Sequence, residues 1–110
     1  MKIVLFRNGA PGIRAEMMGG DMELEEQFET LLGGATEMEP IRANLVLLHL
    51  RNGRRIGLPE HYTLRQRGME DIPIWGDCAA VALDYYGQYM DIGEDTMNRA
   101  LRTVLPAGIP

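Results

Sequence analysis

The sequence contains one cysteine, Cys78, and therefore no internal disulfide. Disulfides are typical of secreted domains, so this scarcity favours a reducing compartment. Residues 1–6 also lack the length and the small-residue cleavage site of a secretion signal. We therefore expect a cytoplasmic protein.

Long hydrophobic segments are also missing. The longest apolar run, residues 45–50, is interrupted by His49 and is far shorter than the roughly 20 residues of a membrane-spanning helix. We expect no membrane partner. Apolar residues make up 45% of the 110-residue chain and charged residues 25%, as in ordinary globular domains. The prediction is a single α+β domain over residues 1–106, followed by a short tail at residues 107–110.

The first half of the chain contains two hairpin signals. Residues 2–7 are β-branched and apolar, residues 8–12 read Asn-Gly-Ala-Pro-Gly, and residues 13–17 return as a partner strand. Asn52 and Gly53 form a dipeptide that supplies the positive φ angles of a two-residue hairpin turn. The sequence therefore predicts hairpins at residues 8–12 and 52–53.

Further strands are predicted around the second turn. Residues 36–39 predict a short strand, and residues 42–51 a longer one whose apolar side chains fall on both faces, as in the middle of a sheet. The return strand after the turn is expected at residues 55–58. Residues 60–71 are polar with little periodicity, so we expect a connection there.

Two segments have helical periodicity. In residues 22–32, the apolar side chains recur on one face, Asp21 is the expected N-terminal cap, and Gly33 ends the helix. The second helix is predicted over residues 94–105, capped by Gly93 and stopped by a proline. The apolar face of the second helix contains Met97, Ala100, Leu101, Val104 and Leu105.

Residues 74–86 suit a helix or a strand equally well, because their centre is rich in alanine. Residues 89–92 predict the last short strand. Together, these patterns predict a mainly antiparallel sheet of about six strands with two amphipathic helices.

The order of these motifs resembles a known family. The shared features are the strand at residues 2–6, Leu31-Leu32-Gly33-Gly34 followed by Glu37, the Asn52-Gly53 turn leading into Gly57-Leu58-Pro59, Ile74-Trp75-Gly76, and the acidic-capped helix at residues 94–105. They resemble the family of small phage and mobile-element proteins catalogued as domain of unknown function 3846. The resemblance implies that residues 78–84 form a strand, that the gene comes from a phage, plasmid or conjugative element, and that the protein acts in a bacterial host cell. It implies no active site.

The residues that commonly carry catalysis form no motif. Cys78 is the one thiol, and either His49 or His61 could take its proton, but the adjacent Asp77 would raise the pKa of the thiol. Neither histidine stands in a metal-ligand spacing with Cys78 or a carboxylate. We therefore expect no enzymatic activity, no cofactor and no metal site.

The charge distribution is more informative than the net charge of −5. Residues 1–41 carry eight acids and three bases, residues 42–68 one acid and six bases, and residues 69–110 seven acids and two bases. An acidic helix face of this kind is usually only solvated, but it can also dock on a basic protein. The candidate residues for binding a protein partner are Asp21, Glu23, Glu25, Glu26, Glu29, Tyr85, Tyr86 and Tyr89.

Basic residues at the predicted hairpin tip offer an alternative. Arg51, Arg54 and Arg55 would suit an anion or a nucleic acid, or would only protect a strand edge. The preferred hypothesis is a small binding protein that inhibits a bacterial defence system, such as CRISPR-Cas or restriction, by covering a basic nucleic-acid-binding protein. The alternative is a nucleic-acid-associated module. An exposed strand edge and the tyrosines would also suit a homodimer.

Overall fold

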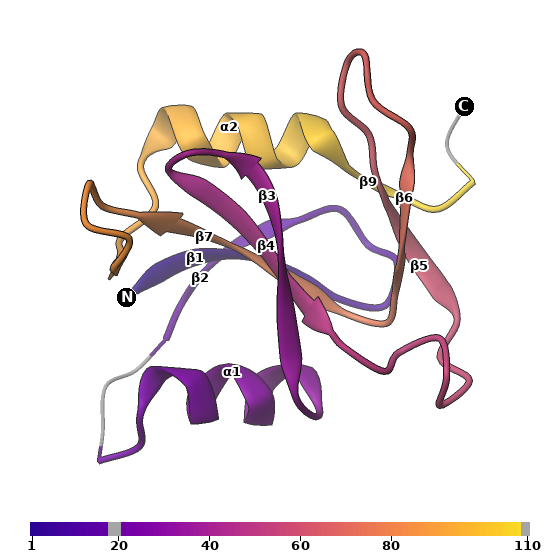
Figure 1. Ribbon diagram of the computed structural model, residues 1–110, viewed down its shortest axis with the longest axis horizontal. Helices are drawn as coiled ribbons and strands as arrows, with labels where there is room; N and C mark the ends of the chain where they lie inside the picture. The colour runs from indigo at the N-terminus through magenta and orange to yellow at the C-terminus, as the bar shows by residue number, and fades with distance from the viewer. Residues whose placement is uncertain (18–20, 109–110) are drawn as a thin grey trace.

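The computed structural model describes residues 1–17 and 21–108 (Figure 1). Its elements in chain order are β1 (Lys2–Phe6), β2 (Ile13–Glu16), α1 (Leu24–Leu32), β3 (Thr36–Arg42), β4 (Leu45–Leu50), β5 (Glu60–Leu64), β6 (Ile72–Trp75), β7 (Cys78–Leu83), β8 (Tyr89–Met90), α2 (Glu94–Thr103) and β9 (Val104–Pro106). Neither helix is long and apolar enough to cross a membrane, as far as the described residues extend.

Two antiparallel sheets organise the chain. The larger sheet has six strands in the order β2-β1-β7-β4-β3, with β8 paired to β7, and the smaller has the order β6-β5-β9. The predicted α+β class and six-stranded antiparallel sheet are thus confirmed. The alanine-rich segment is the central strand β7, which is buried on both faces between β1 and β4.

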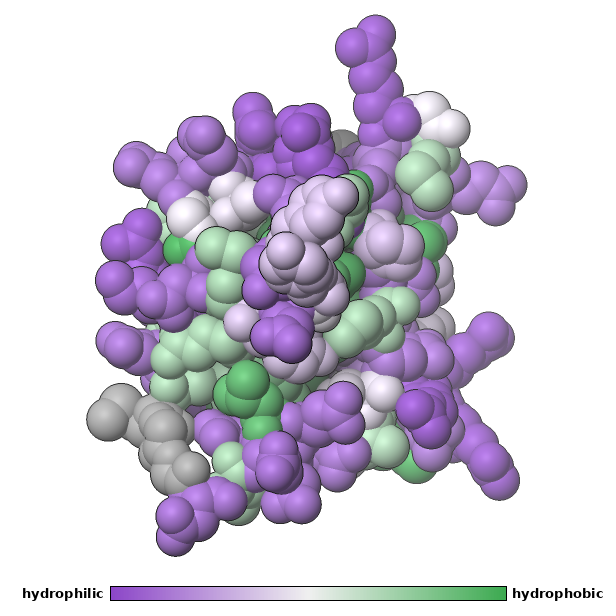
Figure 2. Space-filling view, turned by 60° about the vertical axis from the view of Figure 1, so that its left-hand side comes forward, coloured by the Kyte–Doolittle hydropathy of each residue, from purple (hydrophilic) through white to green (hydrophobic). Residues whose placement is uncertain are grey.

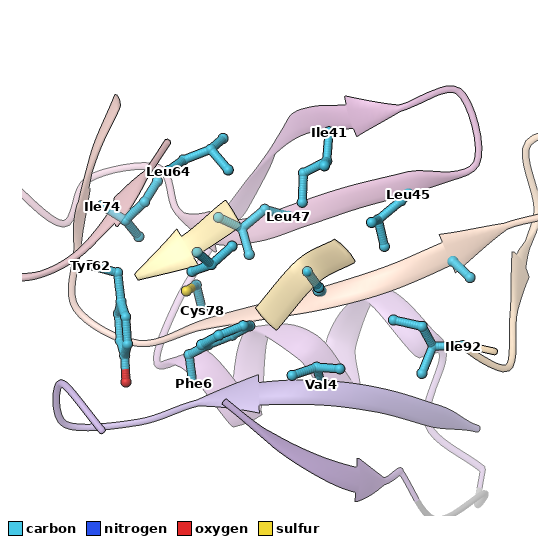
Figure 3. Close-up of a cluster of buried hydrophobic side chains, with 14 residues drawn as sticks. Val4, Phe6, Ile41, Leu45, Leu47, Tyr62, Leu64, Ile74, Cys78 and Ile92 are labelled. Atoms are coloured by element: carbon cyan, nitrogen blue, oxygen red, sulfur yellow. The ribbon is translucent and has the colours of Figure 1, made fainter. Parts of the chain in front are cut away.

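Each face of the larger sheet has its own apolar core. On one face, Phe28 and Leu32 of α1 pack with side chains of β1, β4 and β7. On the other face, α2 and the smaller sheet cover a second core. Figure 1 shows the two helices on opposite sides of the sheet, and Figure 3 shows the second core, with the sulfur of Cys78 among aliphatic and aromatic side chains. The alternation of β1, with Ile3 and Leu5 on one face and Val4 and Phe6 on the other, follows from the period of two in a strand.

The first hairpin prediction is confirmed and the second is wrong. β1 and β2 pair in antiparallel register, and Asn8 and Gly9 between them have φ angles of 54° and 76°. After β4, by contrast, neither Asn52 nor Gly53 has a positive φ. Residues 51–57 instead form consecutive turns that lead to the smaller sheet, and residues 55–58 form no strand. Gly53 is needed there for space, because a Cβ would lie 2.5 Å from the carbonyl oxygen of Trp75.

Other strand boundaries also differ from the predictions, among them the last short strand, expected at residues 89–92 and observed as β8 at Tyr89–Met90. The strand expected at residues 36–39 continues to Arg42. It can include Pro40, which has no N–H group to donate, because β3 is an edge strand. The chain then reverses at residues 43–44, so the predicted strand at 42–51 is shortened to β4. The polar segment expected to be a connection begins with β5, which pairs with both β6 and β9.

The helix ends are also shifted. α1 begins after Glu23, with no side-chain capping bond, so Asp21 does not cap the helix as predicted. Gly33 does end the helix, with a φ of 99°. α2 ends at Thr103, two residues earlier than predicted, because Val104 and Leu105 turn into β9 and pair with β5.

Candidate functional site

The predicted acidic residues of the first helix lie on one solvent-facing surface. Phe28 and Leu32 bury the opposite side of α1, and the helical period therefore turns Glu25, Glu26 and Glu29 outward. Asp21 and Glu23 are exposed just before the helix. None of these five carboxylates has an ion-pair partner among the described residues. We call these five residues the acidic surface.

Tyr89 extends the acidic surface onto the sheet. Its ring meets that of Phe28 edge-on, with 5.5 Å between the centroids. Desolvation by burial, and then the nearby carboxylate of Glu25, raise the pKa of the Tyr89 hydroxyl. The structure therefore brings two of the predicted partner-binding residues, Tyr89 and Glu25, into the same neighbourhood.

Tyr85 and Tyr86 project from the turn between β7 and β8. They are 96% and 85% exposed, and their rings meet edge-on with centroids 5.4 Å apart. The carboxylate of Asp84 accepts hydrogen bonds from the backbone N–H groups of Tyr86 and Gln88, at 2.8 and 2.9 Å. This end of the sheet comes forward in Figure 2, where pale and green side chains form a band between hydrophilic surfaces above and below. Two aromatic side chains are thus held in solvent by an ordered turn.

A small hollow of about 180 Å³ lies between α1 and the β3 edge, lined by Glu25, Glu29, Arg51 and others. The guanidinium of Arg51 donates to the carbonyl oxygen of Thr36 at 3.2 Å, so this base belongs to the acidic side of the molecule. Arg54 instead lies over the ring of Trp75, 5.6 Å from its centroid, while Arg55 is exposed. All three arginines lie in the turns at residues 51–57, but Arg51 contacts β3 and Arg54 contacts β6, so their side chains do not form one group.

Basic side chains gather at a site that the sequence analysis missed. Arg42, Arg99 and Arg102 line a hollow of about 550 Å³ beside α2, together with polar residues that include Asp95. Desolvation and then the charges of Arg42 and Arg102 lower the pKa of Arg99. These three arginines, which we call the arginine hollow, have no ion-pair partner in the part of the chain that the structure describes. In the sequence, the only indication of this site is the three-residue spacing of Arg99 and Arg102, which places them on one helix face.

Cys78 has the environment of a core residue. It is 0% exposed, and burial followed by the charge of Asp77 raises the pKa of its thiol. His49 stands opposite Cys78 in the β4–β7 register, whereas His61 faces Asp77 with 3.8 Å between Nδ1 and Oδ1. A buried, protonated thiol does not suit a nucleophile, because the thiolate is the reactive form.

Comparisons with protein-family models, curated proteins and solved structures found no match. The resemblance described above therefore rests on the order of the sequence motifs.

Proposed function

We propose that this protein is a non-enzymatic binding protein that docks on a basic surface of a protein partner. The observation that supports the proposal is the combination of the unpaired acidic surface with exposed tyrosines on a neighbouring turn. Complementary charge speeds encounter and selects the partner, while tyrosines bury a large area at a small entropic cost. Glu25, Glu26 and Glu29 provide the charge, and Tyr85 and Tyr86 provide the anchors.

The partner we propose is a nucleic-acid-binding protein of a bacterial defence system, such as a CRISPR-Cas or restriction nuclease. The resemblance to a phage and mobile-element family supports this choice, because such elements are the targets of these systems. Glutamates spaced along an exposed helix place negative charges where a basic groove would otherwise hold phosphates. Binding there would exclude the nucleic acid.

The test combines capture of the partner with a nuclease assay. The tagged protein is used to capture its partner from a bacterial lysate, and the purified partner is then assayed for cleavage of its nucleic acid. We expect the wild type to block cleavage and the triple variant Glu25→Lys, Glu26→Lys, Glu29→Lys to lose the block. A matched control reverses three exposed acids away from α1, in Glu60→Lys, Glu70→Lys, Glu94→Lys, and should still block. Full inhibition by a triple variant with a native circular dichroism spectrum would show that the acidic surface is not used.

The arginine hollow favours a second candidate, a nucleic-acid-associated module. Three guanidiniums without carboxylate partners are suited to phosphate contacts. Binding of labelled DNA and RNA would be followed by fluorescence anisotropy at about 50 and 200 mM salt, because phosphate contacts weaken steeply with salt. The double variant Arg99→Glu, Arg102→Glu should bind less than Arg54→Glu, Arg55→Glu. Weaker binding by Arg54→Glu, Arg55→Glu would instead place the nucleic-acid site at the turn after β4. No binding by the wild type at low salt would exclude both sites.

A further inference from the structure

Three titratable side chains that neither proposal uses meet at the β3 edge of the larger sheet. Glu37 stands directly opposite His49 in the β3–β4 register, and Glu39 is two residues further along β3. Because side chains alternate along a strand, both carboxylates lie on the same face as the imidazole. Figure 1 shows β3 and β4 running side by side.

The imidazole of His49 is directed at these carboxylates but bonded to neither. Its Nε2 atom lies 3.7 Å from Oε1 of Glu37 and 3.4 Å from Oε1 of Glu39. A hydrogen bond would need about 2.7–3.2 Å. The side chain is 9% exposed, and Nε2 is buried without a hydrogen-bond partner. A buried polar atom is normally satisfied, so this nitrogen indicates a missing partner.

The spacing of the three groups suits a shared cation. One nitrogen and two carboxylate oxygens lie within 4.8 Å of one another. A first-row metal ion bound at about 2.0–2.2 Å from each ligand holds tetrahedral ligands roughly 3.4 Å apart. The two nitrogen–oxygen distances, 3.7 and 3.4 Å, are close to that value. Small rotations of the exposed Glu37 side chain would complete the site.

We propose that Glu37, Glu39 and His49 bind one divalent transition-metal ion, with Zn²⁺ as the best match. An imidazole together with two carboxylates favours Zn²⁺ over Mg²⁺ or Ca²⁺, which take oxygen ligands. Three protein ligands leave a fourth position open to water or to a side chain of a partner. The ion joins the edge strand β3 to the buried strand β4 and satisfies Nε2 of His49.

Two other groups could bind Zn²⁺ and must be separated from this site. The thiol of Cys78 lies on the strand next to His49, and His61 faces Asp77. The thiol is buried with a raised pKa, and the His61–Asp77 pair supplies only two ligands. Cys78→Ser and His61→Asn therefore serve as control variants.

The experiment is calorimetric titration of the full chain with zinc sulfate at neutral pH in a non-chelating reductant. We expect one ion per chain, loss of binding in His49→Gln, and affinity at least about tenfold weaker in Glu37→Gln and in Glu39→Gln, since even outer-shell partners contribute 10–100-fold. Cys78→Ser and His61→Asn should bind as the wild type does. At the same Zn²⁺ concentration, the melting temperature should also rise more for the wild type than for Glu39→Gln.

Two results would overturn the site. One is the absence of stoichiometric Zn²⁺ binding by the wild type. The other is binding that survives in Glu37→Gln and Glu39→Gln but disappears in Cys78→Ser or His61→Asn. If His49→Gln fails to fold, Glu37→Gln and Glu39→Gln still test the site. They change side chains that are exposed or half-buried, and they keep the size of those side chains.

Discussion

The hydroxyl group of Tyr62 donates a 2.7 Å hydrogen bond to the carbonyl oxygen of Ala10. This bond connects β5 in the smaller sheet to the loop between β1 and β2 in the larger one. The ring of Tyr62 is completely buried and meets that of Phe6 edge-on, with centroids 5.4 Å apart. In Figure 3 the hydroxyl of Tyr62 points out of the apolar cluster. Tyr62 therefore joins the two sheets by packing and by one hydrogen bond.

Replacing Tyr62 should separate these two contributions. Tyr62→Phe keeps the ring but leaves the carbonyl of Ala10 without its donor, and we expect the free energy of unfolding to fall by about 1–2 kcal/mol. Tyr62→Ala also creates a cavity and should cost about 3–5 kcal/mol. Urea denaturation monitored by circular dichroism measures both. An unchanged midpoint in Tyr62→Phe would mean that the bond contributes nothing.

Tyr62 also predicts a loss of stability in alkali. Desolvation, and then the charges of Cys78 and Asp77, raise its pKa to about 12, from about 10 in the unfolded chain. The folded state thus holds the proton more tightly, so this contribution to stability is complete below pH 10 and is lost between about pH 10 and 12. A shift of two units corresponds to roughly 3 kcal/mol. Urea midpoints measured across this pH range should fall less in Tyr62→Phe than in the wild type. An equal fall with pH in both proteins would show that Tyr62 is not the group responsible.

The thiol of Cys78 should be unreactive in the native protein. It is fully buried, and its raised pKa keeps it protonated at neutral pH. We expect Ellman's reagent at pH 8 to modify it only as fast as the chain opens, and immediately in concentrated urea. All modification of the protein reports on Cys78, because the chain has a single cysteine. Rapid modification under native conditions would show that the thiol is accessible and would reopen a chemical role.

Local signals predicted part of this molecule well. The β1–β2 hairpin and the body of α1 follow from adjacent residues, and the outward glutamates of α1 follow from the helical period. The arginine hollow was missed because it joins the β3–β4 turn to α2, which only the tertiary fold brings together. The cluster of Glu37, Glu39 and His49 depends on the β3–β4 register, whereas the sequence pattern predicts one strand over residues 42–51 and hides the turn that sets this register.

The Asn52-Gly53 dipeptide shows why a strong local signal can fail. Its usual meaning is a hairpin with positive φ angles. Here the chain leaves the larger sheet after β4 to build β5, and Gly53 packs against the backbone of Trp75. Glycine is therefore needed at position 53 because a side chain would not fit there, and not because the backbone has a positive φ.

That distinction gives the last prediction. In Gly53→Ala, the new methyl group would lie 2.5 Å from the carbonyl oxygen of Trp75, which belongs to the backbone and cannot rotate away. We expect a loss of about 1–3 kcal/mol in the free energy of unfolding, the usual cost of overpacking. Gly93→Ala is the matched control: Gly93 has a φ of −86°, and its nearest contact would be Thr96 Oγ1 at 3.8 Å. Gly93→Ala should lower the free energy of unfolding by less than about 1 kcal/mol, the typical effect of a substitution at a helix cap. Equal urea midpoints for the two variants would mean that the turn after β4 moves freely, and that its close approach to Trp75 does not hold the smaller sheet in place.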